Sequence, residues 1–150
     1  MRSLLFTVFL TSSLLVMKAQ NSPKMQTTQQ DSTAISQALE TIYYKGIYEG
    51  NVDLLKTIYY PGTLLFGDVK GQPYAKTLEQ YLDGVKNRQS PKDSGKPFEG
   101  KTISVAVVNS IDTVKAHVKM YDFEYDEFIS FHKFDNQWLI VNKMITDVAK

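Results

Sequence analysis

Residues 125–144 read YDEFISFHKFDNQWLIVNKM, and this stretch decides the fold. On both sides of Asp135-Asn136, apolar and polar residues alternate with the period of two that is typical of β-strands. Asp and Asn tolerate the left-handed backbone conformation that a two-residue hairpin turn requires. The stretch therefore predicts a β-hairpin in which Lys133 pairs with Trp138 and Glu127 with Met144.

Strict alternation from this turn divides the hairpin side chains between two faces. One face carries a Trp-Ile-Phe-Ile run, which we expect to face the helices: Glu127, Ile129, Phe131, Lys133, Trp138, Ile140, Asn142 and Met144. The other face is expected to point outward: Phe128, Ser130, His132, Phe134, Leu139, Val141, Lys143 and Ile145.

Length and composition indicate one globular domain. The chain has 150 residues, of which 43% are hydrophobic and 22% charged, so a disordered or fibrous protein is excluded. The formal net charge is +1 and the basic residues form no cluster. Because nucleic-acid binding depends on neutralising phosphates, we expect no nucleic-acid partner.

Residues 1–19 have the layout of a secretory signal peptide. A basic start at Arg2 is followed by an apolar run over residues 4–17 that is too short to span a bilayer. We expect cleavage after Ala19, then a flexible leader over residues 20–31 and a single domain over residues 32–150.

The absence of Cys limits the chemistry and the compartment. It excludes disulfides, a thiol nucleophile, thiolate metal ligands and the lipidated cysteine of a lipoprotein. We therefore expect a periplasmic or secreted protein that has no membrane span after signal removal.

In the rest of the chain, the spacing of apolar residues is helical in some segments and has the period of two of β-strands in others. The expected elements are a helix over 32–49 ended by Gly50, a short helix capped by Asn51, a break at Pro61-Gly62, a strand over 63–68, a helix after a Thr77/Gln80 capping box, a loop over 87–100, and strands over 102–109 and 113–121. Helices followed by long antiparallel strands indicate the α+β class.

Several of these segments resemble a known family. Lys133 and the run Trp138, Ile140, Val141, Asn142 and Lys143 are similar to the C-terminal hairpin of nuclear-transport-factor-2-like proteins, in the group named "putative lumazine-binding" and related to SnoaL-like proteins. The Tyr60-Pro61-Gly62 segment resembles the family's corner before the first strand. The resemblance implies a cone-shaped fold, in which a curved antiparallel sheet packs on three N-terminal helices around a cavity.

Candidate pocket residues follow from the assigned faces. They are Tyr43, Tyr81, Glu127, Phe131, Trp138 and Asn142. Glu127 is the candidate catalytic residue, because a carboxylate in an apolar pocket has a raised pKa and can act as a general acid or base. The alternative is a carboxylate at the rim, near the open end of the cone, that is either solvated or paired with a Lys. His117 and His132 lack the spacing of a metal motif, and we expect neither a metal nor a cofactor.

Two functions fit this pattern. The first is a non-catalytic small-molecule-binding or accessory domain that takes an aromatic or hydrophobic ligand near Trp138. The alternative is an enzyme resembling SnoaL-like cyclases or ketosteroid isomerases, with Glu127 as base and Asn142 or Tyr43 stabilising an enolate oxygen. We expect binding rather than catalysis, because a base accompanied by an orienting partner is not evident.

The outward face of the hairpin predicts a homodimer. Its apolar residues surround a few polar ones, and relatives of this fold pair sheet to sheet. The candidate interface residues are Phe128, His132, Val141 and Lys143, with His132 near the two-fold axis.

Overall fold

The computed structural model describes residues 23–148, so the expected signal peptide lies outside the described residues. The elements are α1 (Pro23–Ala38), a π-helix η1 (Leu39–Tyr44), α2 (Lys45–Glu49), α3 (Val52–Lys56), β1 (Tyr59–Val69), β2 (Gln72–Thr77), α4 (Leu78–Asn87), α5 (Pro91–Ser94), β3 (Phe98–Val108), β4 (Ile111–Met120), β5 (Phe123–Phe134) and β6 (Gln137–Asp147).

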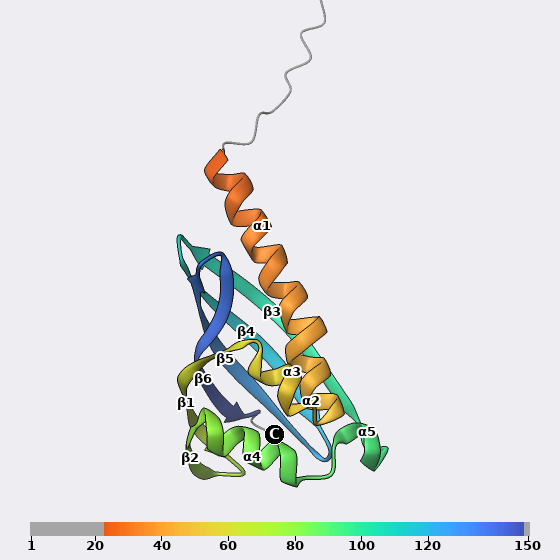
Figure 1. Ribbon diagram of the computed structural model, residues 1–150. Helices are drawn as coiled ribbons and strands as arrows, with labels where there is room; N and C mark the ends of the chain where they lie inside the picture. Colours follow the sequence, from red (N-terminus) through yellow and green to blue (C-terminus); the bar gives the residue numbers. More distant parts are fainter. Residues whose placement is uncertain (1–22, 149–150) are drawn as a thin grey trace, which may run out of the picture.

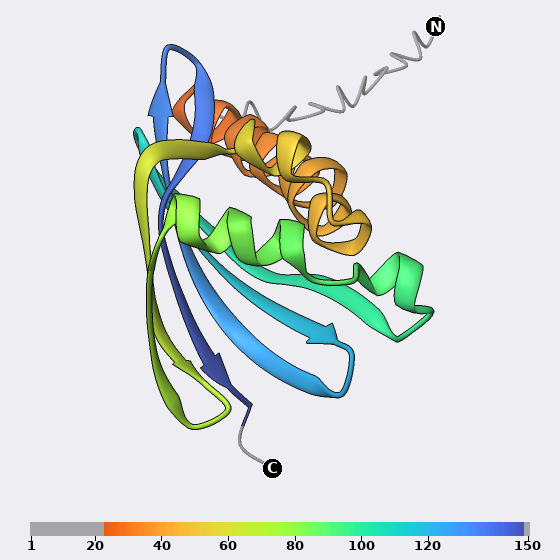
Figure 2. The same cartoon turned by 60° about the horizontal axis from the view of Figure 1, so that its bottom comes forward.

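The strands form one six-stranded sheet in the order β2-β1-β6-β5-β4-β3. Neighbouring strands are antiparallel except β1 and β6, which are parallel, so the sheet is mixed rather than wholly antiparallel. The sheet curves, and the helices lie on its concave side (Figures 1 and 2). The α+β class and the cone-shaped architecture expected from the sequence are confirmed.

The N-terminal helical segment is longer than the sequence predicted. Helix begins at Pro23, so residues 23–31, expected as a flexible leader, are helical. It continues without a break to Glu49 and ends at Gly50, whose φ of 66° is the left-handed cap conformation that the sequence predicted. Among the described residues, no helix is long and apolar enough to cross a membrane.

A π-helical turn in the middle of this segment places two consecutive tyrosines against the sheet. Tyr43 and Tyr44 are 0% and 4% exposed. A π-helix widens the turn, which lets neighbouring positions share one face. The Tyr44 hydroxyl lies 3.1 Å from Oγ1 of Thr102, and its ring packs so closely on β3 that a Cβ at Gly100 would lie 2.3 Å from it. The π-turn thus anchors the helical layer on the sheet.

Local capping signals predicted the shorter helices correctly. Asn51 accepts a hydrogen bond from the Leu54 amide at the start of α3, and Thr77 and Gln80 form the predicted capping box of α4. Two boundaries differ from the prediction. β1 begins before Pro61-Gly62, and the predicted loop over 87–100 contains the one-turn helix α5.

An extra residue in β6 changes the register of the final hairpin. Asp135 and Asn136 both have positive φ, and Phe131 pairs with Ile140 as predicted. The next pair joins Ser130 to Asn142, which leaves Val141 as the additional residue between the two pairs. Two residues opposite one is the definition of a β-bulge.

The bulge reverses the faces of β6 beyond Val141, because a shift of one residue moves each side chain to the other side of a sheet. Lys143 and Ile145 are buried on the concave side, whereas Met144 is 54% exposed on the convex side. Glu127 now pairs with Ile145. The predicted faces were right for β5 and for residues 137–140, and wrong for residues 142–145.

Candidate ligand-binding site

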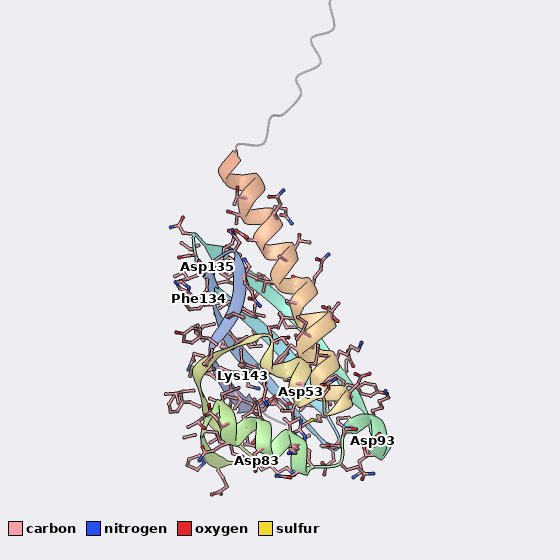
Figure 3. The ribbon with its side chains drawn as sticks, viewed as in Figure 1. Asp53, Asp83, Asp93, Phe134, Asp135 and Lys143 are labelled. Carbon is pink, nitrogen blue, oxygen red and sulfur yellow. The ribbon has the colours of Figure 1, made fainter. Side chains whose placement is uncertain are left out.

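A buried ion pair joins the final hairpin to the helical layer. The Lys143 ammonium donates to Oε1 of Glu127 at 2.7 Å and to the Tyr43 hydroxyl oxygen at 2.8 Å. The Tyr43 hydroxyl donates to Oε2 of Glu127 at 2.7 Å. These three side chains, which we call the polar triangle, come from η1, β5 and β6. Figure 3 shows Lys143 in the middle of the molecule, away from the hairpin turn marked by Asp135.

Aromatic rings surround the polar triangle and exclude water from it. Glu127 and Tyr43 are fully buried, and Lys143 is 3% exposed. The Lys143 ammonium also lies 4.7 Å from the centroid of the Tyr81 ring. Tyr59 packs between Tyr43 and Tyr81, at 6.3 and 5.9 Å between ring centroids. Such a dry environment strengthens the attraction between the charges.

The protonation states of the triangle follow from burial and charge. Burial acts to lower the pKa of Lys143, but the attraction of Glu127 and the nearby tyrosines outweighs it, so the pKa is raised. Burial, and then the negative charge of Glu127, raise the pKa of Tyr43 well above its usual value. At neutral pH Lys143 is therefore a cation and Tyr43 a neutral hydrogen-bond donor. Both Glu127 oxygens already accept a hydrogen bond inside the triangle.

The structure separates the residues expected to line one pocket. Tyr43, Tyr81 and Glu127 meet around Lys143, but Asn142 lies beyond the bulge and donates to the Leu64 carbonyl oxygen at 3.0 Å. Asn142 was therefore wrongly placed on the concave face. Lys143 was likewise wrongly placed outward, as a dimer-interface candidate, and lies in the core.

Phe131 and Trp138 lie toward the other end of the sheet. Both are buried, and the Trp138 indole donates to Oδ1 of Asp31 in α1 at 3.1 Å. The Lys133 ammonium reaches the same oxygen at 2.7 Å. These contacts fix α1 on the tip of the hairpin, so Trp138 holds the helix there.

A cavity opens at the edge of the sheet where three strand ends meet, which we call the mouth. Its volume is about 870 Å³, and its lining comes from the β1–β2 turn, the β4–β5 turn and the end of β6: Lys70, Lys119, Tyr121, Asp122, Phe123, Glu124, Asp147 and Val148. Figure 2 shows these strand ends side by side at one edge. A volume of this size accommodates a small organic molecule.

Aromatic side chains lead from the mouth toward the polar triangle. The Tyr121 and Phe123 rings lie 6.1 Å apart, and the Phe123 and Tyr125 rings stack at 5.8 Å. Tyr125 is buried, two residues before Glu127 on the same face of β5. Aromatic rings at these distances attract one another beyond their simple burial. The mouth is therefore walled by aromatic surface that is continuous with the core.

A smaller groove of about 480 Å³ lies on the helical side, between α3, α4 and the start of β1. Its apolar floor includes Val52, Leu78 and Leu82, and its charged side chains are two lysines and two carboxylates. The positive and negative charges of this groove balance, and Tyr59 is the single aromatic residue in its described lining. The groove therefore offers less aromatic surface for a planar ligand to stack on than the mouth does.

A second buried carboxylate lies at the end of the sheet opposite the mouth. Asp112 in β4 is 3% exposed, forms no ion pair with a described residue, and neither of its Oδ atoms makes a well-formed hydrogen bond there. Burial raises its pKa to about 6, although the nearby backbone of Ala106 and Thr113 opposes that shift. Burying a charge without a partner destabilises the folded state.

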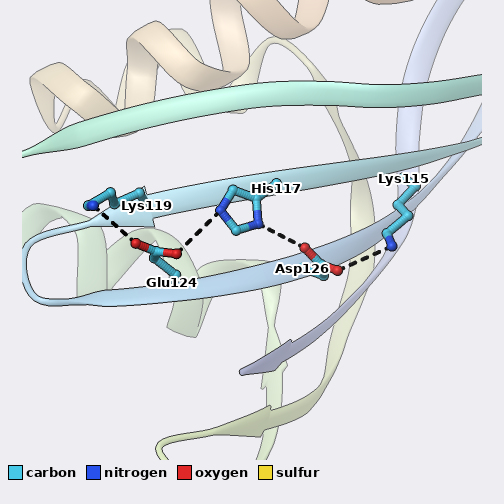
Figure 4. A network of polar contacts seen from close by, with 5 residues as sticks. All are labelled: Lys115, His117, Lys119, Glu124 and Asp126. Carbon is cyan, nitrogen blue, oxygen red and sulfur yellow. Dashed lines mark hydrogen bonds and ion pairs between the residues drawn. The ribbon is translucent and has the colours of Figure 1, made fainter. Parts of the chain in front are cut away.

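The convex face combines a charged network with an apolar patch. Lys115, His117, Lys119, Glu124 and Asp126 form linked ion pairs across β4 and β5 (Figure 4). The hydrogen bond from His117 is the main reason that the pKa of Asp126 is lowered. Beside the network lies the convex patch, four apolar side chains that are 44 to 54% exposed: Leu64, Phe66, Phe128 and Met144.

No group of three or more His, Asp or Glu within residues 23–148 is arranged to hold a metal ion. The structure adds three residues that the sequence did not place in the pocket: Lys143, expected at a dimer interface, in the triangle, and Phe123 and Tyr121 at the mouth. Only Lys143 had a signal in the sequence, because it is one of the hairpin positions that matched the family pattern. A lysine at such a position inside an apolar strand indicates a buried partner.

The curved sheet and the helical layer on its concave side are those of the nuclear-transport-factor-2-like fold. Solved structures with this fold include NTF2-like proteins of unknown function from Silicibacter pomeroyi, with a TM-score of 0.72, 16% identity and coverage of 81% of this chain and 98% of that chain, and from Shewanella baltica, with a TM-score of 0.70, 17% identity and coverage of 81% and 97%. A third, from Methylobacillus flagellatus, has a TM-score of 0.70, 16% identity and coverage of 80% and 94%.

Residues 30–146 match the protein family described as "Putative lumazine-binding", and the chain belongs to this family. Among curated proteins, none matches the chain significantly. Family and fold together support a small-molecule-binding domain.

The polar triangle makes a prediction for paired tyrosine variants. Tyr43→Phe should lower the free energy of unfolding by about 1.5–3 kcal/mol, because it removes a hydrogen bond to a buried carboxylate. Tyr59→Phe is the matched control, since the Tyr59 hydroxyl is buried near Tyr43 and Tyr81 but makes no well-formed hydrogen bond to a described residue and none to Glu127 or Lys143. It should be neutral or stabilising. Urea unfolding at pH 7 measures both, and equal losses would contradict the role of the triangle.

Asp112 makes a prediction about pH. Its folded pKa of about 6 lies above the usual value of 3.8, so the folded protein binds a proton that the unfolded chain releases between these values. Lowering the pH through 6 therefore relieves a destabilising charge. Asp112→Asn should raise the free energy of unfolding at pH 7.5 by about 1–3 kcal/mol, and the gain should shrink at pH 4.5.

The control for this experiment is Asp135→Asn, which removes a carboxylate from the exposed hairpin turn. Its free energy of unfolding should equal that of the unmodified protein at both pH values. A gain for Asp112→Asn that is the same at pH 7.5 and 4.5 would show that the charge of Asp112 is not the cause.

Proposed function

We propose that this protein is an exported domain that binds a small aromatic or hydrophobic molecule at the mouth, without catalysing a reaction on it. The observation that carries the proposal is the cavity of about 870 Å³ edged by Tyr121 and Phe123. Planar ligands stack on such rings, and the stacked Phe123 and Tyr125 extend the apolar wall inward. The family description favours a ligand of the same kind.

The state of Glu127 favours binding over general acid/base catalysis. A catalytic base must lie within hydrogen-bonding reach of the substrate proton that it removes. Glu127 is fully buried, its oxygens are taken by Lys143 and Tyr43, and it does not line the mouth. Asn142, the partner expected for an enolate oxygen, lies on the convex side of the sheet. The polar triangle is better suited to hold the interior together.

Export is the part of the proposal that rests on sequence alone. Residues 1–19 have the basic start and short apolar run of a signal peptide. A chain without Cys gains no stability from disulfides in an oxidising compartment, so its stability there depends on packing and on the buried polar triangle.

The binding proposal predicts a ligand effect that depends on Phe123. Lumazine, 2-naphthol and 2-naphthoate are suitable planar probes, and at least one should raise the melting temperature at millimolar concentration. Phe123→Ala should abolish the shift, whereas Phe128→Ala, which removes a phenyl ring from the convex face, should preserve it. The proposal fails if no probe stabilises the protein, or if the shift survives loss of Phe123.

We also propose that two copies pair through the convex patch. Phe66 pairs with Met144, and Met144 with Phe128, so these side chains form a continuous row across three strands. Large contiguous apolar patches are rare on monomers, and a two-fold axis would place this row against its own copy. Phe128 and the half-buried Val141 and His132 belong to this side of the sheet, but Lys143 does not.

The pairing is tested by sedimentation at micromolar concentration. The unmodified protein should sediment as a dimer, and Phe128→Glu should convert it to a monomer because a charge would be buried against an apolar surface. Val108→Glu changes an apolar residue outside the patch that is more exposed than Phe128, and it should leave the dimer intact. A monomeric unmodified protein, or a dimer that tolerates Phe128→Glu, would refute the proposal.

A further inference from the structure

The mouth continues into a second hollow of about 300 Å³ that is distinctly basic, which we call the basic groove. It lies between the β4–β5 turn and the segment that joins α4 to α5. Its lining includes three basic residues, Lys70, Arg88 and Lys96, and one acidic residue, Asp122. Lys70, Tyr121, Asp122 and Phe123 line both hollows, so the mouth and the basic groove are adjoining parts of one site.

Arg88 is held in the wall of this groove with unused hydrogen-bonding capacity. It is the C-cap residue of α4, in an extended conformation that turns the chain away from the helix. Its side chain is half-buried, and its Nε is buried without a hydrogen-bond acceptor among the described residues. A buried guanidinium N–H without an acceptor carries a free-energy penalty, and a turn of the Arg88 side chain toward an anion in the groove would relieve it.

The other two cations lie over the aromatic rings. The Lys70 ammonium is 4.8 Å from the centroid of the Phe123 ring, and the Lys96 ammonium is 6.0 Å from that of Tyr121. Neither ammonium forms an ion pair with a described carboxylate. Both lysines are exposed and flexible, so they can turn from a ring face toward an anion.

Two of the three acidic residues that line the mouth, Glu124 and Asp147, have partners outside the basic groove. Glu124 pairs with Lys119 at 3.0 Å and faces the charged network of the convex side. Asp147 accepts a hydrogen bond from the Gly71 amide at 3.0 Å and so fastens the β1–β2 turn. Neither Glu124 nor Asp147 lines the basic groove, so Asp122 is the one carboxylate in its described lining.

The two walls of the groove are fastened together independently of any ligand. The Tyr121 hydroxyl donates to the Gln89 carbonyl oxygen, and the Tyr121 amide donates to the Pro97 carbonyl oxygen at 3.0 Å. These bonds hold the β4–β5 turn against the segment that carries Arg88. A site whose walls are fixed in advance loses little entropy when a ligand binds.

We propose that the ligand of the mouth is a planar aromatic molecule that carries an anionic group. Its ring lies against Phe123, and its carboxylate or phosphate occupies the basic groove, where Arg88 donates hydrogen bonds and Lys70 and Lys96 supply charge. This inference rests on the proposed function, because it specifies the chemistry of the molecule bound at the same site. An Arg fork is suited to planar oxyanions, and hydrogen bonds between charged groups are roughly twice as strong as neutral ones.

Three probes with the same ring system test the inference by calorimetry at pH 7: 2-naphthol, 2-naphthoate and 2-naphthyl phosphate. At least one anion should bind about tenfold or more tightly than 2-naphthol, the factor that one charge-assisted hydrogen bond supplies. Whichever anion binds more tightly identifies the group as carboxylate or phosphate. Raising the salt concentration should weaken the binding of the anions and leave the binding of 2-naphthol unchanged.

In the Arg88→Gln variant, the affinity for the anion should come within about twofold of the affinity for 2-naphthol, because the variant lacks the positive charge that the anion contacts. Lys86→Gln is the matched control: it removes a cation two residues earlier, from an exposed position that lines the other groove, and should leave the preference intact. Lys96→Gln, at an exposed loop position, provides a second test that does not risk the fold, and should weaken anion binding alone.

The possible failures are distinguishable. If 2-naphthol binds as tightly as both anions, or if Arg88→Gln and Lys96→Gln leave the preference unchanged, the anionic ligand is refuted while aromatic binding at the mouth stands. If none of the three probes binds, the proposed function fails together with the inference drawn from it.

Discussion

The contact between Lys143 and Glu127 constrains the interior of this protein, because neither charge is tolerable there alone. Removing one partner of a buried ion pair typically costs about 3–5 kcal/mol, since the other charge stays behind without solvent. The pair therefore requires β5 and β6 to keep one register and requires Tyr43 to remain within reach of both groups. The helical layer, the hairpin and the bulge are thereby coupled at a single point.

This coupling explains two irregularities that would otherwise weaken the fold. The bulge at Val141 interrupts the ladder between β5 and β6, yet it turns Lys143 inward toward Glu127. The π-turn departs from regular α-helix geometry, yet it allows Tyr43 to reach the triangle while Tyr44 packs on Gly100. Irregular backbone persists where the surrounding contacts require it.

A closed interior also determines where a ligand can bind. The tyrosines and the ion pair occupy the centre of the cone, so the accessible aromatic surface is found at the mouth, around Phe123. The mouth is built from turns that are fastened by single side chains, such as Tyr121 and Asp147. Turns vary more freely than the core, which allows proteins that share this fold to bind different molecules.

The sequence by itself determined the elements whose causes are local. Asp135-Asn136 specified the hairpin turn, Thr77 and Gln80 the start of α4, and Gly50 the end of the helical segment, because each depends on backbone preferences within a few residues. The family pattern indicated the cone. Only the tertiary structure decided which faces Lys143 and Asn142 occupy. The bulge at Val141 has no local sequence signal, and it is stabilised by the contact of Lys143 with Glu127 on the neighbouring strand. The basic groove beside the mouth was decided in the same way, because Lys70, Arg88 and Phe123 meet only when three separate parts of the chain are packed together.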